Sequence, residues 1–406
     1  MQQFDVVVVG CGPAGGQCAR QLTQAGWRVL LLERYQNFEK NSFSSAGTPI
    51  ATLETFNLPE TVVGSFWHQL AIVTSHKQGH WQSEHPLGCV LDFTKLRQFL
   101  AEQVKAYGGE VWLGTRYLHH VETAAGAIVT LRNNLLNQEI VVQTQVLVDA
   151  TGPARMVMDR QREPRSDLIN GLGVEYLIEV SPAIYQTYAS TLTFFLGYDW
   201  IPAGYSWVFP MEANRLKVGS GILNAPHHIV PEVEPLKVYI QRVIDRHIQP
   251  GSYQLIDIHG ATVRYSSGLQ DTYSQGRTIA IGDAVSTINF LGGEGIRHAM
   301  LSGNIAAQYI QRYLRQEIQP FDAYREEMHR IFLTQWNRSE KLGLKKYLQD
   351  SDELVDRVVD YLHPMSLEDV VDVLFYYKFE KVAKNLWSYI WRKLQQRWRD
   401  FWFTRE

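Results

Sequence analysis

The sequence predicts an α/β fold in which a doubly wound parallel sheet is joined to an antiparallel-sheet domain and a helical C-terminal region. Three observations predict it. The first 34 residues read as strand, glycine turn, helix and strand; residues 165–270 form short runs between turn residues; and the pattern becomes helical from about residue 316. With 406 residues the chain has room for two or three domains and needs no disulfide or metal to stabilise a core.

The N-terminal segment predicts a βαβ unit. The apolar, β-branched run Phe4–Val9 is typical of a strand buried on both faces of a parallel sheet. Residues 14–25 place small and apolar side chains on one helical face, and Gly26 closes that helix. Val29–Leu32 is a second buried strand that runs into Glu33.

The turn between the first strand and the helix has the glycine spacing of a dinucleotide-binding fold. Gly10 permits a tight turn, Gly12 lets the backbone approach a pyrophosphate, and Gly15 lets helix and strand pack closely. Pro13-Ala14 completes the loop, whose free amides face the phosphates at the positive end of the helix dipole. Glu33 stands where an acidic side chain accepts hydrogen bonds from ribose hydroxyls, so we expect a Rossmann-like cofactor domain.

Two later segments favour FAD over NAD. Val146–Gly152 and Ile279–Ala284 are buried strands that run into glycine turns, and Asp283 follows the second, where a carboxylate can hold ribityl hydroxyls. Leu291–Gly303 is a glycine-rich loop opening a helix, whose amides can stabilise a reduced isoalloxazine. These segments supply further predicted cofactor-binding residues: Gly152, Gly282, Asp283, Gly292, Gly293, Gly295 and Ile296.

Between these segments, the runs Gly171–Val180, Thr191–Leu196, Tyr205–Pro210 and Leu216–Leu223 predict an antiparallel sheet. We expect it to carry six aromatic side chains on or near one surface: Phe194, Phe195, Trp200, Tyr205, Trp207 and Phe209. Most such aromatics form the core of a sheet rather than a binding surface.

The chain resembles flavoproteins of the geranylgeranyl reductase family, within the larger group of aromatic hydroxylases, flavin halogenases and lycopene cyclases. The resemblance runs, with gaps, from residue 1 to about 315. The Tyr-x-Trp-x-Phe-Pro segment favours the reductase branch, in which it lies beside the flavin ring on the substrate-domain sheet. The matching segments are Gly10–Gly15 with Glu33-Arg34, Asp149–Gly152, Tyr205–Pro210, and Gly282-Asp283 with Gly292–Gly303.

The resemblance implies roles for individual residues. Trp207 and Tyr205 are the candidate catalytic residues, with Tyr205 as the candidate proton donor. Phe194, Trp207 and Phe209 are expected to line the substrate, and Arg34 to join Glu33 at the cofactor.

Two positions depart from the family's pattern. Ser44–Gly47 occupies the stretch in which the family usually has a Cys-Gly pair, and it contains no cysteine. Phe93 occupies the place where the family tends to carry an arginine, and Arg97 follows one helical turn later. Either Arg97 substitutes as a cofactor-binding residue, or the flavin is held differently.

The domain boundaries follow from these segments. Residues 1–40, 90–165 and 271–315 are predicted to form a discontinuous FAD-binding domain, and residues 41–89 and 166–270 the substrate domain. Residues 316–406 form the helical C-terminal region, with helices expected at Phe321–Trp336, at Leu354–Leu362 and from about Ser366.

Residues 375–406, the C-terminal tail, combine aromatic and basic side chains. The tail has 8 basic and 3 acidic residues, a net charge of +5, and holds 4 of the 11 tryptophans. One predicted helical face is apolar and aromatic and the other basic, as in helices that lie at a lipid headgroup boundary. We expect the tail to bind a membrane surface or a membrane protein; packing on the body or on a second subunit is the alternative.

Composition limits the partners and the compartment. The net charge of −3 gives no overall attraction to nucleic acid. Three cysteines and no signal-peptide pattern favour a reducing compartment, so we expect a cytoplasmic protein peripheral on the membrane. The histidines at 68, 76, 80 and 85 lack metal-ligand spacing, so no metal site is predicted.

The predicted function is an FAD-dependent oxidoreductase that reduces a double bond of a hydrophobic isoprenoid- or carotenoid-type substrate at the membrane surface. No second Gly-x-Gly-x-x-Gly follows a strand, so NADPH docking transiently or an electron-carrier protein would supply electrons. Three alternatives stay open: a flavin monooxygenase acting on an aromatic or quinone ring, a lycopene cyclase-like non-redox flavoenzyme, and a flavoprotein assembly factor of a membrane complex.

Overall fold

The computed structural model describes residues 1–40, 44–158, 167–226, 233–289, 291–319, 321–348 and 351–382. Its strands are β1 (Gln2–Val9), β2 (Val29–Leu32), β3 (Gly47–Pro49), β4 (Val63–Trp67), β5 (Gln69–Val73), β6 (Gln78–Gln82), β7 (Gly88–Leu91), β8 (Glu110–Trp112), β9 (Thr115–Thr123), β10 (Gly126–Asn133), β11 (Gln138–Asp149), β12 (Ile169–Glu179), β13 (Thr191–Gly197), β14 (Ile201–Met211), β15 (Arg215–Asn224), β16 (Gln254–Tyr265), β17 (Ser274–Gln275) and β18 (Thr278–Ala280). Its helices are α1 (Pro13–Gln24), α2 (Ala51–Thr55), α3 (Phe93–Ala106), α4 (Pro182–Tyr188), α5 (Leu236–Val243), α6 (Ile296–Leu314), α7 (Asp322–Met328), α8 (Thr334–Leu348), α9 (Asp352–Leu362) and α10 (Leu367–Tyr376).

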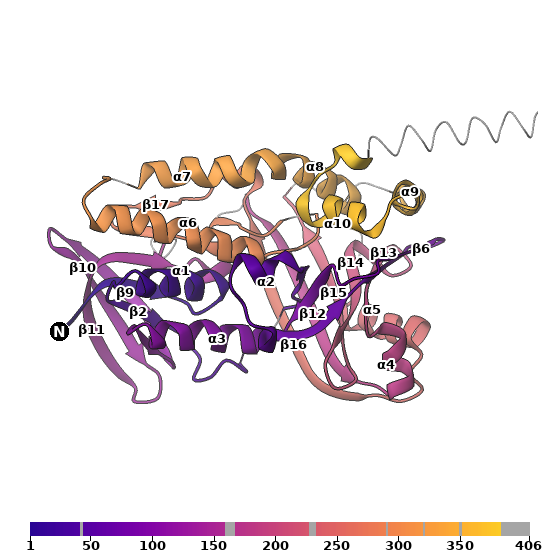
Figure 1. Ribbon diagram of the computed structural model, residues 1–406, viewed down its shortest axis with the longest axis horizontal. Coiled ribbons are helices and arrows are strands. Elements are labelled where there is room, and N and C mark those ends of the chain that lie inside the picture. The colour runs from indigo at the N-terminus through magenta and orange to yellow at the C-terminus, as the bar shows by residue number, and fades with distance from the viewer. Residues whose placement is uncertain are drawn as a thin grey trace, which may run out of the picture.

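Among the described residues, one sheet has the order β17-β18-β11-β1-β2-β8, and its central pairs are parallel. Helices α1, α3 and α6 cover one face of this sheet, and the β9–β10–β11 ribbon covers the other (Figure 1). Alternate residues of β1 show why both faces are apolar: Val6 and Val8 pack in the core toward the helices, and Val7 and Val9 pack toward the ribbon. The predicted βαβ start is confirmed.

The second sheet has the order β16-β12-β15-β14-β13-β5-β6. Its pairs are antiparallel, as predicted, except that β13 pairs parallel with β5. That exception reflects connectivity: more than a hundred residues separate β5 from β13, so no hairpin turn dictates their relative direction. The strands β3, β7 and β4 form a small third sheet beside it.

The prediction that six aromatic side chains share one surface is wrong for two of them, Phe195 and Trp200. Phe194, Tyr205, Trp207 and Phe209 share one core on one face of the second sheet. Phe195 and Trp200 belong to a different core, on the face covered by α4 and α5. Because successive strand residues point to opposite faces, Phe194 and Phe195 cannot both face the same way.

The C-terminal region is helical, as predicted. A single turn of π-helix, His329–Leu333, joins α7 to α8, and α8 continues well past the predicted end at Trp336. Helices α8, α9 and α10, which we call the cover, lie over the aromatic face of the second sheet (Figure 1). No helix among the described residues is long and apolar enough to cross a membrane.

The beginning of the predicted tail belongs to the body of the protein. Phe375 and Tyr377 are buried, and Tyr377 ends α10 in a left-handed conformation with φ 58°. The tail therefore is not one continuous helix from residue 375. Its amphipathic part, residues 383–406, lies outside the described residues.

Candidate active site

In the glycine turn after β1, Gly10 and Gly15 pack closely against the backbone, whereas Gly12 borders open space in which a ligand could lie. A Cβ atom on Gly10, which has φ +110°, would lie 2.3 Å from the carbonyl oxygen of Ala150, and one on Gly15 would lie 2.0 Å from that of Gly10. A Cβ on Gly12 would meet no atom of the described residues within 4 Å, because Gly12 borders an open cleft. The backbone amides at the start of α1 carry no side-chain cap, so they remain available to an anion.

This cofactor cleft has a volume of about 890 Å³ and runs along the carboxyl ends of β1, β2 and β11. Gly10, Gly12, Glu33 and Arg34 line it on one side and Gly152 on the other. Ligands of doubly wound sheets bind at this edge, so its position fits an extended dinucleotide.

Glu33 and Arg97 form a buried ion pair in the wall of the cofactor cleft. Their Oε2 and Nη2 atoms lie 2.7 Å apart, and Arg97 Nε donates a 3.1 Å hydrogen bond to the carbonyl oxygen of Cys11. The guanidinium also lies 5.6 Å from the ring centre of Phe93. Arg97 therefore places its charge beside the phosphate loop, which favours the first of the two alternatives left by the sequence.

Asp283 supplies an unpartnered buried oxygen. It follows Gly282, where a Cβ would lie 2.7 Å from the Cβ of Ala14, so this turn packs against the first turn of α1. Among the residues that the structure describes, the Oδ1 atom of Asp283 has no hydrogen-bond partner. Burial raises the pKa of Asp283 to about 6, and the nearby charge of Arg155 opposes that rise. A buried acceptor without a donor fits the hydroxyl groups of a ribityl chain.

The loop Gly292–Gly295 is held against the second sheet by Tyr205. The Tyr205 hydroxyl donates a 3.0 Å hydrogen bond to the carbonyl oxygen of Gly292. Gly293 has φ +66°, and a Cβ there would lie 2.4 Å from the same hydroxyl. Burial raises the pKa of Tyr205 to about 12, so the hydroxyl keeps its proton. Its role as proton donor stays a prediction, and it would require this hydrogen bond to break.

Trp207 stands in a small cavity of about 130 Å³, the junction cavity, between the two sheets. Its Nε1 atom donates a 2.9 Å hydrogen bond to Glu175, and its ring occupies the space that a Cβ on Gly219 would fill. The hydrogen bond and the close contact with Gly219 therefore hold the tryptophan ring in one orientation. Burial raises the pKa of Glu175 and lowers that of Lys217, whose ammonium donates to the carbonyl oxygen of Ser44 at 2.7 Å.

Two of the three predicted substrate-lining residues, Phe194 and Phe209, border a third space, the apolar cavity, of about 550 Å³, whereas Trp207 borders the junction cavity instead. Phe194 and Phe209 meet edge to face with ring centres 5.3 Å apart, and Tyr347 of α8 donates a 2.5 Å hydrogen bond to the carbonyl oxygen of Leu291. Ile296, predicted as a cofactor residue, lines this cavity. Ser45, Tyr205 and Gly293 border both this cavity and the junction cavity, and Ala261 borders both the junction cavity and the cofactor cleft.

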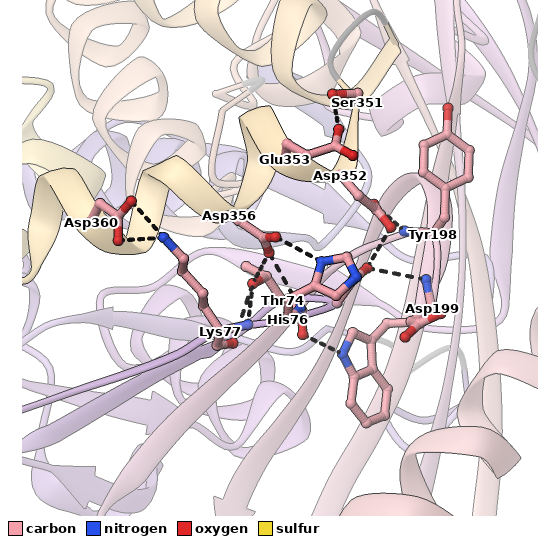
Figure 2. Close-up of polar contacts among 12 residues, drawn as sticks. Thr74, His76, Lys77, Tyr198, Asp199, Ser351, Asp352, Glu353, Asp356 and Asp360 are labelled. Atoms are coloured by element: carbon pink, nitrogen blue, oxygen red, sulfur yellow. Dashed lines mark hydrogen bonds and ion pairs between the residues drawn. The ribbon is translucent and has the colours of Figure 1, made fainter.

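The cover is anchored to the second sheet by polar contacts from α9 (Figure 2). Asp356 accepts hydrogen bonds from the Thr74 hydroxyl and from Nδ1 of His76, at 2.5 and 2.8 Å. The hydrogen bond to Asp356 is the main cause that raises the pKa of His76. Lys77 contacts Asp360 at 2.6 Å, and Asp352 accepts from the backbone amide of Tyr198 at 2.8 Å. His76 thus belongs to an anchor, and no group of three potential metal ligands occurs among the described residues.

Some residues of the site had no signal in the sequence. Asn289 accepts from the Leu291 amide and so shapes the glycine loop. Arg297, in the first turn of α6, donates to the carbonyl oxygen of Phe375 and so joins α6 to α10. Tyr347 lies beyond the helix predicted to end at Trp336, and Phe375 is the first residue of the predicted membrane-binding tail. These contacts depend on how distant segments pack, and spacing along the chain does not encode that.

The residues that line the cofactor cleft match the chemical groups of FAD. An adenosine-side acidic residue and a phosphate loop with free amides line it. The buried, unpartnered carboxylate oxygen of Asp283 does not line the cleft; it lies in the turn that packs against the first turn of α1. The glycine loop and Trp207 border the space beyond, where an isoalloxazine ring would lie between cleft and apolar cavity.

Comparisons with known proteins agree with this geometry. The FAD dependent oxidoreductase family model matches residues 5–159, and the geranylgeranyl reductase catalytic domain model matches residues 174–263. A digeranylgeranylglycerophospholipid reductase of Haloferax volcanii is 30% identical over 388 residues, covering 88% of this chain and 91% of that protein.

Solved structures of other proteins share the fold. A geranylgeranyl bacteriochlorophyll reductase-like protein from Thermoplasma acidophilum has a TM-score of 0.79 at 23% identity, covering 95% of this chain and 96% of that one. The p-nitrophenol 4-monooxygenase of Pseudomonas putida has a TM-score of 0.72 at 16% identity, covering 94% and 99%. The fold therefore accommodates both a reductase-like protein and a monooxygenase, and does not by itself select the reaction.

The fold, the cofactor cleft and the family models define an FAD-dependent oxidoreductase. Within that class, the chain belongs to the geranylgeranyl reductase family.

Proposed function

We propose that this protein reduces carbon–carbon double bonds of an isoprenoid lipid whose chain lies in the apolar cavity. The observation that carries the proposal is continuity: the apolar cavity meets the junction cavity at Tyr205 and Gly293. Its volume lies within the range of ~300–1,000 Å³ typical of small-molecule sites. The relatives' names, digeranylgeranylglycerophospholipid reductases, favour geranylgeranyl chains carried on a glycerophospholipid.

The residues of this chain position the reactants. Gly12, Glu33 and Asp283 would hold FAD, which when bound and reduced supplies a hydride to the substrate. Phe194 and Phe209 orient the isoprenoid chain and exclude water from the double bond. The apolar lining favours an alkene over the polar rings on which aromatic hydroxylases act.

The proposal includes a place at the cytoplasmic membrane surface, reached through the tail. Phe375, Phe379 and Val382 line the apolar cavity, so the chain leaves the described part of the structure at the wall of that cavity. The basic and aromatic composition of residues 383–406 suits anionic lipid. NADPH or an electron-carrier protein would reduce the flavin, since the sequence has one dinucleotide fingerprint.

Anaerobic mixing tests the reaction. The holoenzyme is reduced chemically and mixed with a geranylgeranyl glycerophospholipid without oxygen. We expect flavin absorbance near its oxidised maximum to return at a rate that depends on lipid concentration. Reoxidation that requires oxygen and ignores the lipid would contradict the proposal.

Deletion of residues 383–406 tests the membrane part separately. The shortened protein should lose binding to anionic vesicles and reduce lipid in vesicles slowly, while it reduces the same lipid in detergent at the full rate. Undiminished vesicle binding would overturn the role of the tail and leave the reaction itself untouched.

A further inference from the structure

The charged residues that line the apolar cavity are divided between its two ends. Glu294 lies at the inner end, where Arg297 contacts both of its carboxylate oxygens at 2.8 Å, so that charge is neutralised locally. The other charged lining residues are Lys345 and Lys346, both in the last turn of α8. The cavity is therefore apolar along its length and cationic at one end.

The cationic end is the opening of the cavity. Leu342 of α8 and Tyr361 of α9 line it and are 43% and 37% exposed, which places the mouth between these two helices. Lys345 follows Leu342 by three residues, the spacing of neighbours on one face of a helix, and is itself exposed. An isoprenoid chain entering here would leave its polar end beside Lys345.

The two lysines are held differently. The Nζ atom of Lys346 donates a 3.2 Å hydrogen bond to the carbonyl oxygen of Leu354, which ties α8 to the first turn of α9. Among the residues that the structure describes, no carboxylate lies within 4.0 Å of the Lys345 ammonium. A favourable interaction with the helix dipole accounts for basic residues in a last turn, but not for their lining of a cavity.

We propose that Lys345, supported by Lys346, binds the phosphate group at the polar end of the substrate. This inference rests on the proposed function and deepens it: the substrate is an isoprenoid that carries phosphate, either as a glycerophospholipid or as a prenyl diphosphate. A phosphate held at the mouth fixes how far the chain enters the cavity. Lys345 thereby sets which double bond reaches Tyr205 and Gly293.

Binding to the FAD-containing protein tests this without turnover. Equilibrium dialysis compares geranylgeranyl diphosphate, a geranylgeranyl glycerophospholipid in detergent, and geranylgeraniol, which has no phosphate. For Lys345→Ala we expect about tenfold weaker binding of one or both phosphate ligands and unchanged binding of the alcohol. The ligand that weakens identifies the source of the phosphate.

Two further variants make the comparison specific. Lys341→Ala removes an exposed lysine one turn earlier on α8 that does not line the cavity, and it should bind all three ligands normally. Lys345→Arg keeps the charge and should restore binding of the phosphate ligands. In turnover assays, Lys345→Ala should raise KM for the phosphate substrate, leave kcat nearly unchanged and broaden the set of double bonds reduced.

Three results would overturn the headgroup assignment: equal weakening for the alcohol and the phosphates, no weakening for any ligand, or the same loss in Lys341→Ala. Because binding is measured without reaction, a protein that binds phosphates through Lys345 but reduces no isoprenoid would contradict the proposed function alone.

Discussion

The hydroxyl of Tyr205 donates a 3.0 Å hydrogen bond to the carbonyl oxygen of Gly292, and this bond joins the substrate sheet to the glycine loop that opens α6. The two residues come from separate predicted domains, yet they border the point at which the junction cavity meets the apolar cavity. Tyr205 thus helps to shape the place where cofactor and substrate would meet.

Tyr205→Phe should keep the fold and most of the activity. The variant loses one hydrogen bond, worth ~1 kcal/mol, while the ring still packs against Phe194 and Trp207. We expect kcat to fall only a few-fold, with an unchanged pH profile of kcat. A loss of a hundredfold or more, together with a vanished alkaline limb in that profile, would make the hydroxyl the proton donor.

Gly12→Ala should separate cofactor binding from stability. The added methyl group meets no atom in the described part of the chain, so the free energy of unfolding of the flavin-free protein should change by less than about 0.5 kcal/mol. The methyl group would project into the cofactor cleft, and the flavin content after purification should fall about tenfold or more. Gly15→Ala, whose Cβ clashes with backbone, should instead destabilise the fold. Full flavin content in Gly12→Ala would refute the location of the phosphates.

Asp283→Asn should stabilise the flavin-free protein in a pH-dependent way. The folded-state pKa of Asp283, about 6, lies above the value of ~3.9 in an unfolded chain, so its contribution to stability falls as pH rises between these values, by at most about 3 kcal/mol. The melting temperature of the variant should match that of the wild type near pH 4 and exceed it at pH 7. An equal difference at both pH values would show that Asp283 is not the titrating group.

Substitutions of two aspartates of α9, Asp356 and Asp360, should lower the free energy of unfolding by unequal amounts, because the two anchor the cover differently. Asp356 is buried and accepts from Thr74 and His76, so Asp356→Ala should lower the free energy of unfolding by about 1–3 kcal/mol. Asp360 pairs with Lys77 in a more exposed position, and Asp360→Ala should cost less than about 1 kcal/mol. Denaturant titration measures both, and hydrogen exchange should rise across α9 in the first variant. Equal losses would mean that α9 is not held through Asp356.

The local parts of this fold could be predicted from the sequence because short-range chemistry specifies them. The spacing of Gly10, Gly12 and Gly15 determines a turn, and the strand that ends at Leu32, just before Glu33, is predicted from its apolar run. Aromatic content alone places Phe195 and Trp200 on the wrong face of the second sheet, because it takes no account of strand alternation.

The cover was the part that spacing could not reveal. Helical periodicity identified α9 and the start of α10, but nothing in it indicates that Phe375 or Tyr347 closes a cavity against Phe194. The link from Lys217 to the carbonyl oxygen of Ser44 is equally invisible, since 173 residues separate the two. Such contacts depend on tertiary packing, which overrides local pattern.

Mass spectrometry of the product tests the central proposal most directly. The holoenzyme, a chemical reductant and a geranylgeranyl glycerophospholipid are incubated with and without oxygen. The lipid is then extracted and its molecular mass is measured. The account predicts products that gain two hydrogen atoms for each double bond reduced, in equal yield without oxygen. Products that gain an oxygen atom, or cyclised products of unchanged mass, would contradict it.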